Sequence, residues 1–450
     1  MSVPLFAHAS PNAVLAYRGR QPILAAQFLA DVDQLAKRLP KRGHMLNACA
    51  DRYHFAVGFA ASLQQKITSL LPSTHTSEVI GHVRAFAPDV FCLTDDPDCE
   101  IELPRLAFPA HPAELRTIPA LSDWRVPEIA FEQCAAYVFT SGSTGLPLPH
   151  RKTWGRLHQC VRIEAQRLGL STHRAWTLLA TVPTQHMYGL ETSLLLALAN
   201  GHAFCAERPF YPADIAAQLS ALPRPRLLVT TPVHLRALLN SGVALPPVDL
   251  VVAATAPLDP KVAAQAELLF DAPLLEIYGA TETGQIALRR TTHSLSWTLW
   301  PEVELSIRDG VSWAQGGHIE QPTALADILE LSEPGCFLLH GRSVDLINVG
   351  GKRSSLAYLN YQLTAIPGVV DGAFFLREDC GDATAAGVDR LGAVVVAPSL
   401  SADTIREHLR RTLDPVFLPR PLLIVESIPR NATGKLPLAA LQSLVQRYRS

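Results

Sequence analysis

The chain of 450 residues contains no long apolar run. No stretch of about 18 or more uncharged apolar residues occurs, so the sequence predicts no membrane-spanning helix and no membrane partner. The first four residues, Met1 to Pro4, carry no charged region followed by an apolar one, so no secretory signal is visible. We therefore expect a cytoplasmic protein.

Metal-site cysteine patterns and an excess of charge of one sign are also absent. The 8 cysteines form no C-x-x-C pair and no close His/Cys cluster, which argues against a zinc site and favours reduced thiols. With 39 basic and 41 acidic residues, the formal net charge is −2. This balance gives no sign of a nucleic-acid partner or of binding to a membrane surface.

The chain does have enough apolar material for more than one core. Hydrophobic residues make up 48% and charged residues 18%, which is typical of a folded interior and argues against disorder. In one stretch, strand-like apolar runs alternate with helical patterns. The strands are expected at 226–231, 248–254 and 273–277, and the helices at 232–239 and 259–270. This alternation predicts an α/β fold with a parallel sheet, which binds ligands beyond the carboxyl ends of its strands.

The segment Thr140–Gly145 reads T-S-G-S-T-G and follows the apolar run 135–139. Its two glycines let backbone N–H groups turn inward around an anion, and its four hydroxyl side chains add further donors. It is not the P-loop of kinases and GTPases, because Leu146 and Pro147 stand where that loop has Lys and Ser or Thr. The segment therefore predicts a different kind of phosphate-binding loop.

Three further motifs follow this loop in a fixed order. They are Tyr278-Gly279-Ala280-Thr281-Glu282, Gly341-Arg342-Ser343-Val344-Asp345, and Pro429-Arg430-Asn431-Ala432-Thr433-Gly434-Lys435. As a series of four, the motifs resemble those of the adenylate-forming superfamily, which includes acyl- and aryl-CoA synthetases, peptide-synthetase adenylation domains and firefly-type luciferases. The resemblance extends from about Tyr137 to Leu441.

This resemblance implies two domains joined by a hinge. A large N-terminal domain of parallel-sheet α/β subdomains, with the ATP and acid sites, is expected at 1–341, and the hinge at 342–345. A small, mobile C-terminal α+β domain, which rotates between two catalytic steps, is expected at 346–450. The family usually has Asp or Lys at the hinge position, whereas this chain has Val344, which leaves the details of the rotation open.

The resemblance also assigns the nucleotide site. Glu282 is expected to hold Mg²⁺, Thr281 to reach the α-phosphate, and Tyr278 to border the adenine ring, with a core tyrosine as the structural alternative. The residues expected to cradle the β- and γ-phosphates are Thr140, Ser141, Gly142, Ser143, Thr144 and Gly145.

Four more residues take roles by the same resemblance. Asp327, which lies 15 residues before Arg342, is expected to accept the ribose hydroxyls. Arg342 would contact ribose or phosphate, with an interdomain salt bridge as the alternative. Lys435 would supply a point cation to the attacking carboxylate and the α-phosphate. His186, in a P-x-x-H-x-x-G segment, would border the acyl pocket, with a core histidine as the alternative.

The chain also departs from the family pattern. The lysine that usually follows Thr-Gly-x-Pro is replaced by Leu148, so either Arg151 or Lys152 is expected to carry its charge. After the hinge, the usual Pro-x-Glu-x-Glu is replaced by residues 356–360. These departures are similar to those of the small ligases of aryl-polyene and xanthomonadin-type pigment pathways, which load a hydroxyaryl acid onto an acyl carrier protein.

The expected activity is ATP-dependent activation of a carboxylic acid as an acyl-adenylate, followed by transfer to a phosphopantetheine thiol. The apolar segment 251–256 contains no acidic residue to hold an amino group, so an aryl or acyl acid is expected. An acyl carrier protein is the expected acceptor. The alternatives are a CoA synthetase using free CoA and a non-catalytic nucleotide-binding relative. A monomer and a homodimer are both open.

Overall fold

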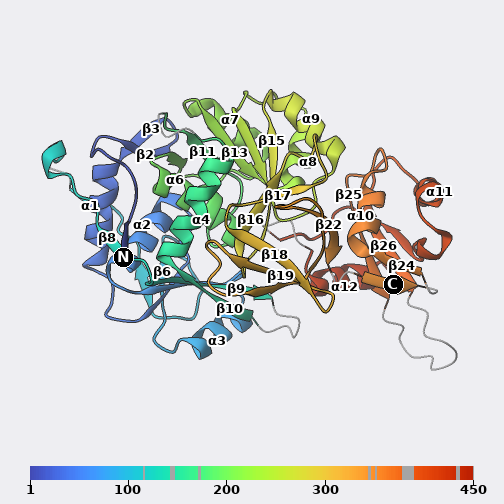
Figure 1. Cartoon of the computed structure of the whole chain (residues 1–450), viewed down its shortest axis with the longest axis horizontal. Helices are drawn as coiled ribbons and strands as arrows, with labels where there is room; N and C mark the ends of the chain where they lie inside the picture. The colour runs from blue at the N-terminus through green and yellow to red at the C-terminus, as the bar shows by residue number, and fades with distance from the viewer. Residues whose placement is uncertain are drawn as a thin grey trace.

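Three parallel strands and two helices occur where the sequence predicts them, and the strands lie in the middle of the larger sheet (Figure 1). The computed structural model describes residues 1–114, 117–141, 147–170, 174–342, 346–349, 352–377, 390–431 and 436–448. In chain order the central elements are β13 (Arg226–Thr230), α8 (Pro232–Asn240), β14 (Leu250–Ala253), α9 (Pro260–Phe270) and β15 (Leu274–Ala280).

Local sequence explains why these elements begin where they do. Leu250 to Ala253 are all buried, as expected for a parallel strand that is covered on both faces. Pro232 occupies the first turn of α8, where its missing N–H is not needed, and the Thr231 side chain accepts a hydrogen bond from the His234 N–H. Asp259 caps α9 in the same way, through the N–H of Lys261.

These strands belong to an eleven-stranded sheet. The strands on the β15 side are antiparallel, whereas β11, β12, β2 and the central strands run parallel and β3 pairs antiparallel with β2. The remaining members are β21 (Asp327–Leu331), β22 (Cys336–Arg342), β17 (Trp297–Leu299), β16 (Gly284–Arg289), β11 (Thr177–Ala180), β12 (Ala203–Cys205), β2 (Val14–Arg18) and β3 (Gln21–Leu24).

A second sheet of six strands lies beside the first. Its order is β10 (Pro147–Thr153), β9 (Cys134–Ser141), β5 (Thr68–Leu71), β4 (His44–Asn47), β6 (Phe91–Thr94) and β7 (Arg105–Ala107). All neighbours are parallel except β9 and β10. The run 135–139 thus lies within β9, as predicted. Thr140 lies near the end of β9 and Tyr278 lies within β15, so the two motifs belong to strands of different sheets.

Helices and short strands complete the larger part of the chain. The helical segments are α1 (Ala25–Ala36), α2 (Arg52–Gln64), α3 (Ser77–Phe86), η1 (Leu121–Asp123), α4 (Trp154–Arg167), α5 (Met187–Gly189), η2 (Leu190–Leu195, a π-helix), α6 (Leu196–Asn200) and α7 (Pro212–Ala221). The strands are β1 (Ser2–Pro4), paired with β8 (Glu128–Ala130), and a three-stranded sheet of β18 (Val303–Arg308), β19 (Val311–Gly316) and β20 (Thr323–Leu325).

The elements after β22 form a smaller α+β domain to one side of the larger body, drawn in orange and red in Figure 1. They are β23 (Leu346–Val349), β24 (Lys352–Ser355), α10 (Leu356–Thr364), β25 (Asp371–Arg377), β26 (Arg390–Val396), α11 (Ala402–Thr412), η4 (Pro415–Phe417), β27 (Leu422–Ile424) and α12 (Leu438–Arg447). The expected α/β class, with a large N-terminal domain and a smaller C-terminal one, is confirmed. Its mobility stays a prediction, and Val344 lies outside the described residues.

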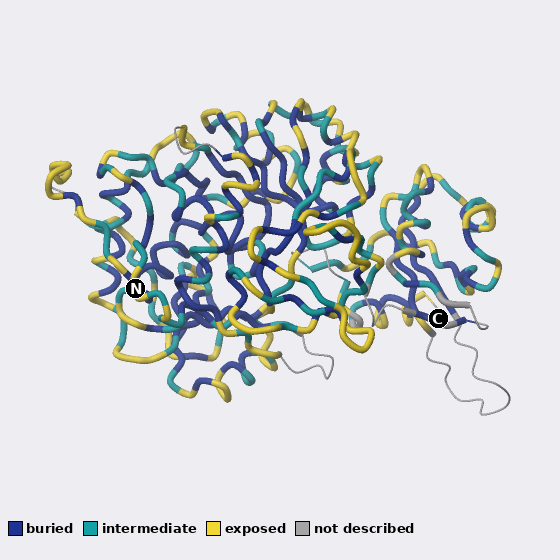
Figure 2. Tube along the Cα trace, viewed as in Figure 1, coloured by how far each residue is buried: buried dark blue, intermediate teal, exposed yellow. Residues whose placement is uncertain are grey.

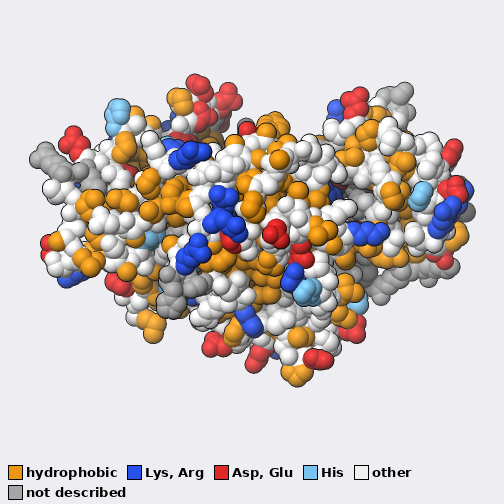
Figure 3. All heavy atoms as spheres, turned by 90° about the horizontal axis from the view of Figure 1, so that it is seen from above, with side chains coloured by type: hydrophobic (Ala, Val, Ile, Leu, Met, Phe, Trp, Pro, Cys, Tyr) orange, Lys and Arg blue, Asp and Glu red, His pale blue; other side chains and the backbone are white. Residues whose placement is uncertain are grey.

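Burial follows this division of the chain. The strands of both large sheets run through the buried interior, and most exposed backbone lies in peripheral loops and helices (Figure 2). On the face shown in Figure 3, basic side chains occur in small groups among hydrophobic and acidic ones. In the described part of the chain, no helix is both long and apolar enough to span a bilayer. The seven cysteines described there are free thiols.

Candidate active site

Thr140 and Glu282 are brought together by a histidine of β10. β10 runs antiparallel to β9, which places His150 beside the end of β9. The ring Nε2 of His150 lies 2.9 Å from the Thr140 hydroxyl oxygen and 3.6 Å from Oε1 of Glu282. The first and second motifs therefore meet at one place, although their strands belong to different sheets. Residues 142–146 lie outside the described residues, and so do the side chains of Ser141 and Pro147.

The residue Glu282 sits in a tight turn between two antiparallel strands. β15 ends at Ala280 and β16 begins at Gly284. A Cβ at Gly279 would come within 2.3 Å of the Gly284 carbonyl oxygen, so only glycine fits this close approach. The Thr283 hydroxyl accepts a hydrogen bond from the Ala280 N–H at 3.3 Å. The turn leaves the Glu282 side chain 37% exposed, so its carboxylate can meet a ligand.

Tyr278 and Asp327 are joined directly. The Tyr278 hydroxyl donates a hydrogen bond of 2.8 Å to Oδ2 of Asp327. The tyrosine ring is buried and packs against Trp297 and Phe337, with ring centroids 5.6 and 5.4 Å away. Asp327 is also the strand partner of Arg342, the last residue of β22. The nucleotide residues predicted on β15 and β21 thus lie side by side, while the Arg342 side chain is not described.

The two cations that follow Leu148 lie on opposite faces of β10. Arg151 points outward, where it forms a 3.0 Å ion pair with Glu320. Lys152 points inward and is buried, and its Nζ donates a 2.9 Å hydrogen bond to the Glu282 carbonyl oxygen. Leu148 itself is 50% exposed. The structure therefore places Lys152 beneath the Glu282 turn and Arg151 on the surface.

His150 is a site residue that the sequence analysis does not predict. The available signal is the alternation of side chains along a strand, which puts His150 and Lys152 on one face of β10 and Arg151 on the other. Burial of the ring is the main cause that lowers the pKa of His150. His150 therefore approaches Glu282 chiefly as a neutral ring near neutral pH.

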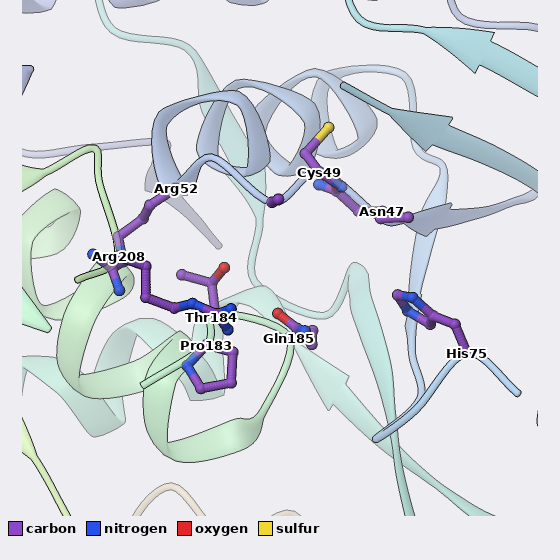
Figure 4. Close-up of a pocket in the computed structure, with 10 residues that line it drawn as sticks. Asn47, Cys49, Arg52, His75, Pro183, Thr184, Gln185 and Arg208 are labelled. Atoms are coloured by element: carbon purple, nitrogen blue, oxygen red, sulfur yellow. The ribbon is translucent and has the colours of Figure 1, made fainter. Parts of the chain in front are cut away.

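A pocket of about 190 Å³ adjoins the segment that leads to His186. Figure 4 shows Thr184 and Gln185 on one side of this pocket, and Asn47 and His75 on the other. His186 is half-buried and directly precedes α5. The pocket is lined by Asn47, Ala48, Cys49, Ala50, Arg52, His75, Pro183, Thr184, Gln185 and Arg208.

The two arginines that line this pocket differ in burial and in hydrogen bonding. Arg52 is buried, and its guanidinium donates to the carbonyl oxygens of Cys205, Glu207, Ala180 and Val182 at 2.9–3.0 Å. Arg208 is exposed at the end of the pocket, and the two exposed aromatic residues Phe210 and Tyr211 follow it in the chain. The pocket thus offers the Gln185 amide, the Thr184 hydroxyl and one accessible cation, Arg208.

The apolar segment 251–256, where the acid pocket is expected, begins within β14 and continues just beyond it. Val251 to Ala253 lie in β14 and are fully buried. The hydroxyl of Tyr188, two residues after His186, donates a 3.0 Å hydrogen bond to the Val252 carbonyl oxygen. The His186 segment therefore contacts the strand that the sequence analysis assigns to the acid.

The donor set near Glu282 fits a metal ion that is held mainly by its nucleotide. Within the described residues, no group of three or more His, Cys, Asp or Glu side chains could hold a metal. Mg²⁺ commonly binds through one or two carboxylates together with substrate phosphates and water. One accessible carboxylate, Glu282, beside a predicted phosphate loop meets that need. The predicted Lys435 lies outside the described residues.

Known proteins with similar sequences are acid–CoA ligases. Residues 5–328 match the family of AMP-binding enzymes. The chain is 31% identical over 309 residues to the 4-coumarate–CoA ligase of Rhodobacter capsulatus, which covers 68% of this chain and 75% of that protein. It is 26% identical over 350 residues to a 4-chlorobenzoate–CoA ligase of an Arthrobacter species, which covers 68% of this chain and 65% of that protein.

A solved structure shows the same fold. The O-succinylbenzoate coenzyme A synthetase of Bacillus subtilis, in complex with ATP and a magnesium ion, superposes with a TM-score of 0.78. The superposition covers 98% of this chain and 97% of that one, at 19% sequence identity. From the family match and these relatives, we conclude that the chain belongs to the AMP-binding enzymes and is an AMP-forming acid–thiol ligase of the adenylate-forming superfamily.

Proposed function

We propose that this ligase activates an aryl carboxylic acid, of the hydroxybenzoate or hydroxycinnamate type, and loads it onto an acyl carrier protein. In the first step a carboxylate oxygen attacks the α-phosphorus of ATP, and pyrophosphate leaves. In the second step a phosphopantetheine sulfur attacks the acyl carbon, AMP leaves, and the thiol proton passes to solvent. The convergence of Thr140, His150 and Glu282 supports the first step, and the aryl-acid ligases among the relatives support the substrate class.

Each of the described site residues has its own role in the first step. Thr140 begins the loop for the β- and γ-phosphates, and Asp327, oriented by the Tyr278 hydroxyl, accepts the ribose hydroxyls. Glu282 would hold Mg²⁺, and Thr281 would reach the α-phosphate. Bound Mg²⁺ would offset the phosphate charge that the incoming carboxylate must approach. Preorganised donors around the phosphates are usually the largest contribution to such a reaction.

An aryl acid suits the chain better than an amino acid. Val251 to Ala253 are fully buried within β14, so the residues that can border an acid are 254–256, and these contain no carboxylate for an ammonium group. Placing an unpaired ammonium against apolar surface is strongly unfavourable. The relatives named for 4-coumarate and 4-chlorobenzoate support the same substrate class.

A matched pair of acids tests this choice in the ATP–pyrophosphate exchange assay. 3-(4-Hydroxyphenyl)propionate and L-tyrosine differ only in the amino group, so they report on the missing carboxylate. We expect exchange with the first acid to exceed that with the second by about tenfold or more, because of the unpaired ammonium. Hydroxybenzoates and hydroxycinnamates should also exceed long-chain fatty acids. Fastest exchange with an amino acid would show that the assigned acid pocket is wrong.

The pocket beside His186 is our candidate for the thiol arm. The Gln185 amide and the Thr184 hydroxyl suit the amide-bearing phosphopantetheine chain. A free CoA nucleotide carries several phosphates, but among the described lining residues Arg208 is the one accessible arginine. The exposed pair Phe210 and Tyr211, with ring centroids 5.3 Å apart, instead provides aromatic surface of the kind enriched at protein interfaces.

The second candidate, a CoA synthetase, is favoured by the CoA ligases among the relatives. The two are separated by thioester formation with a phosphopantetheinylated carrier protein and with CoA at equal concentration. We expect faster loading of the carrier, and a loss of about tenfold for the carrier alone when Phe210 and Tyr211 are both replaced by serine. The exposed Leu268, replaced by serine, is the control. Equal or faster turnover with CoA would contradict the carrier assignment.

A further inference from the structure

A buried ammonium supports the Glu282 turn from below. The Nζ of Lys152 donates to the main-chain carbonyl oxygen of Glu282 at 2.9 Å, and the lysine is 8% exposed. Two residues earlier on the same face of β10, His150 reaches the carboxylate of the same glutamate. β10 thus contacts Glu282 at two points, one on its main chain and one on its side chain.

A buried carboxyl group from another element lies near the same turn. Glu191, in the π-helix η2, is 1% exposed and accepts a 3.1 Å hydrogen bond from the Cys160 thiol. Burial lowers the pKa of Lys152, and the nearby Glu191 carboxyl group acts to raise it. Glu191 also reaches the end of the turn, since a Cβ at Gly284 would lie 2.9 Å from its Oε1. Lys152 and Glu191 therefore lie together beneath residues 281–284.

This arrangement argues against a phosphate-binding role for Lys152. The buried Lys152 ammonium already donates to a main-chain carbonyl oxygen, and the Glu191 carboxyl group lies nearby. A hydrogen bond from an ammonium to a main-chain carbonyl fixes the position of that peptide group. The side chain direction of the residue that bears the carbonyl is then fixed as well.

We propose that Lys152 is a positioning residue that fixes the backbone of Glu282 and so aims its carboxylate at the bound nucleotide. This inference rests on the proposed role of Glu282. It gives Lys152 a role that does not include contact with phosphate, although Lys152 lies close to Leu148, where the family usually has a lysine.

The test separates positioning from simple structural support by removing Lys152 alone and together with Glu191. Lys152→Met leaves the Glu191 carboxyl group buried without the nearby ammonium, and we expect a lower melting temperature. The double variant Lys152→Met/Glu191→Gln also removes that buried carboxyl group, so its melting temperature should recover most of the loss. It still lacks the hydrogen bond to the Glu282 carbonyl, so its affinity for MgATP, measured by titration calorimetry, should stay about tenfold below wild type.

Arg151→Met is the matched control, because it removes the neighbouring cation on the opposite face of β10. It should leave MgATP affinity unchanged. Wild-type affinity in the stable double variant would overturn the positioning role, and so would an unchanged affinity in Lys152→Met. The calorimetric result does not depend on the acid or the acceptor. Wild-type protein that binds MgATP but gives no acid-dependent exchange would refute the proposed function alone, and the same affinity comparison would still decide the role of Lys152.

Discussion

Replacing Glu282 by glutamine should lower acid-dependent pyrophosphate exchange by about 10²-fold or more. The amide keeps the size of the side chain but removes the charge that faces the metal–phosphate cluster, and losses of this order follow removal of one preorganised electrostatic group. The carboxylate is partly exposed, and its one ion-pair contact within the described residues is with His150, so the melting temperature should stay within about 2 °C of wild type. The measurement is exchange rate as a function of Mg²⁺ concentration.

The Mg²⁺ titration makes the first result specific. A lost metal ligand should raise the Mg²⁺ concentration that gives half-maximal exchange, whereas a damaged fold should lower the rate at every concentration. Glu330→Gln is a suitable control, since this carboxylate is 61% exposed and its ion pair is with the exposed His340. An unchanged Mg²⁺ requirement in Glu282→Gln would remove this residue from the metal site.

Replacing Lys435 by alanine should damage one half-reaction and spare the other. If the C-terminal domain docks Lys435 at the reacting carboxylate during adenylation, the variant loses a cation that faces developing charge, a loss of about 10²-fold or more. Supplied with preformed acyl-adenylate, the variant should load the thiol at a nearly normal rate, because rotation has moved residue 435 away. The measurement compares pyrophosphate exchange with single-turnover thioester formation.

The proposed hinge gives the converse variant. Val344→Pro restricts the backbone where the two domains join, so thioester formation should slow while adenylation is largely kept. Equal damage to both half-reactions by Lys435→Ala would contradict the two-state picture and make this lysine a general binding residue.

Parts of this fold are predictable because their signals are local. The stretch from β13 to β15 combines mainly apolar strands with Pro232 and Asp259 at helix starts, and each signal lies within a few residues of its effect. The eleven-stranded sheet is less accessible from the sequence. Its far edge is built by pairing Ala16 with Phe204, a contact between distant parts of the chain that neither periodicity nor turn residues encode.

The candidate site, too, is only partly predictable from the sequence. Motif order predicts that Thr140 and Glu282 act together, but not that their strands lie in separate sheets or that His150 links them. The candidate cations Arg151 and Lys152 are adjacent in sequence, and the pleat of β10 separates their roles. Knowing that residues 147–153 form a strand would have been enough to assign them to opposite faces, but the sequence pattern around Leu148 reads as part of a loop.

The central claim is that the acid attacks the α-phosphorus of ATP, and isotope transfer from the acid tests it most directly. The enzyme is given ATP, a carrier thiol and an aryl acid labelled with ¹⁸O in both carboxylate oxygens, and the phosphorus products are analysed by ³¹P NMR and mass spectrometry. The proposed reaction predicts AMP carrying one ¹⁸O atom, together with unlabelled pyrophosphate. Formation of ADP with the label in inorganic phosphate would show an acyl-phosphate intermediate and contradict the claim.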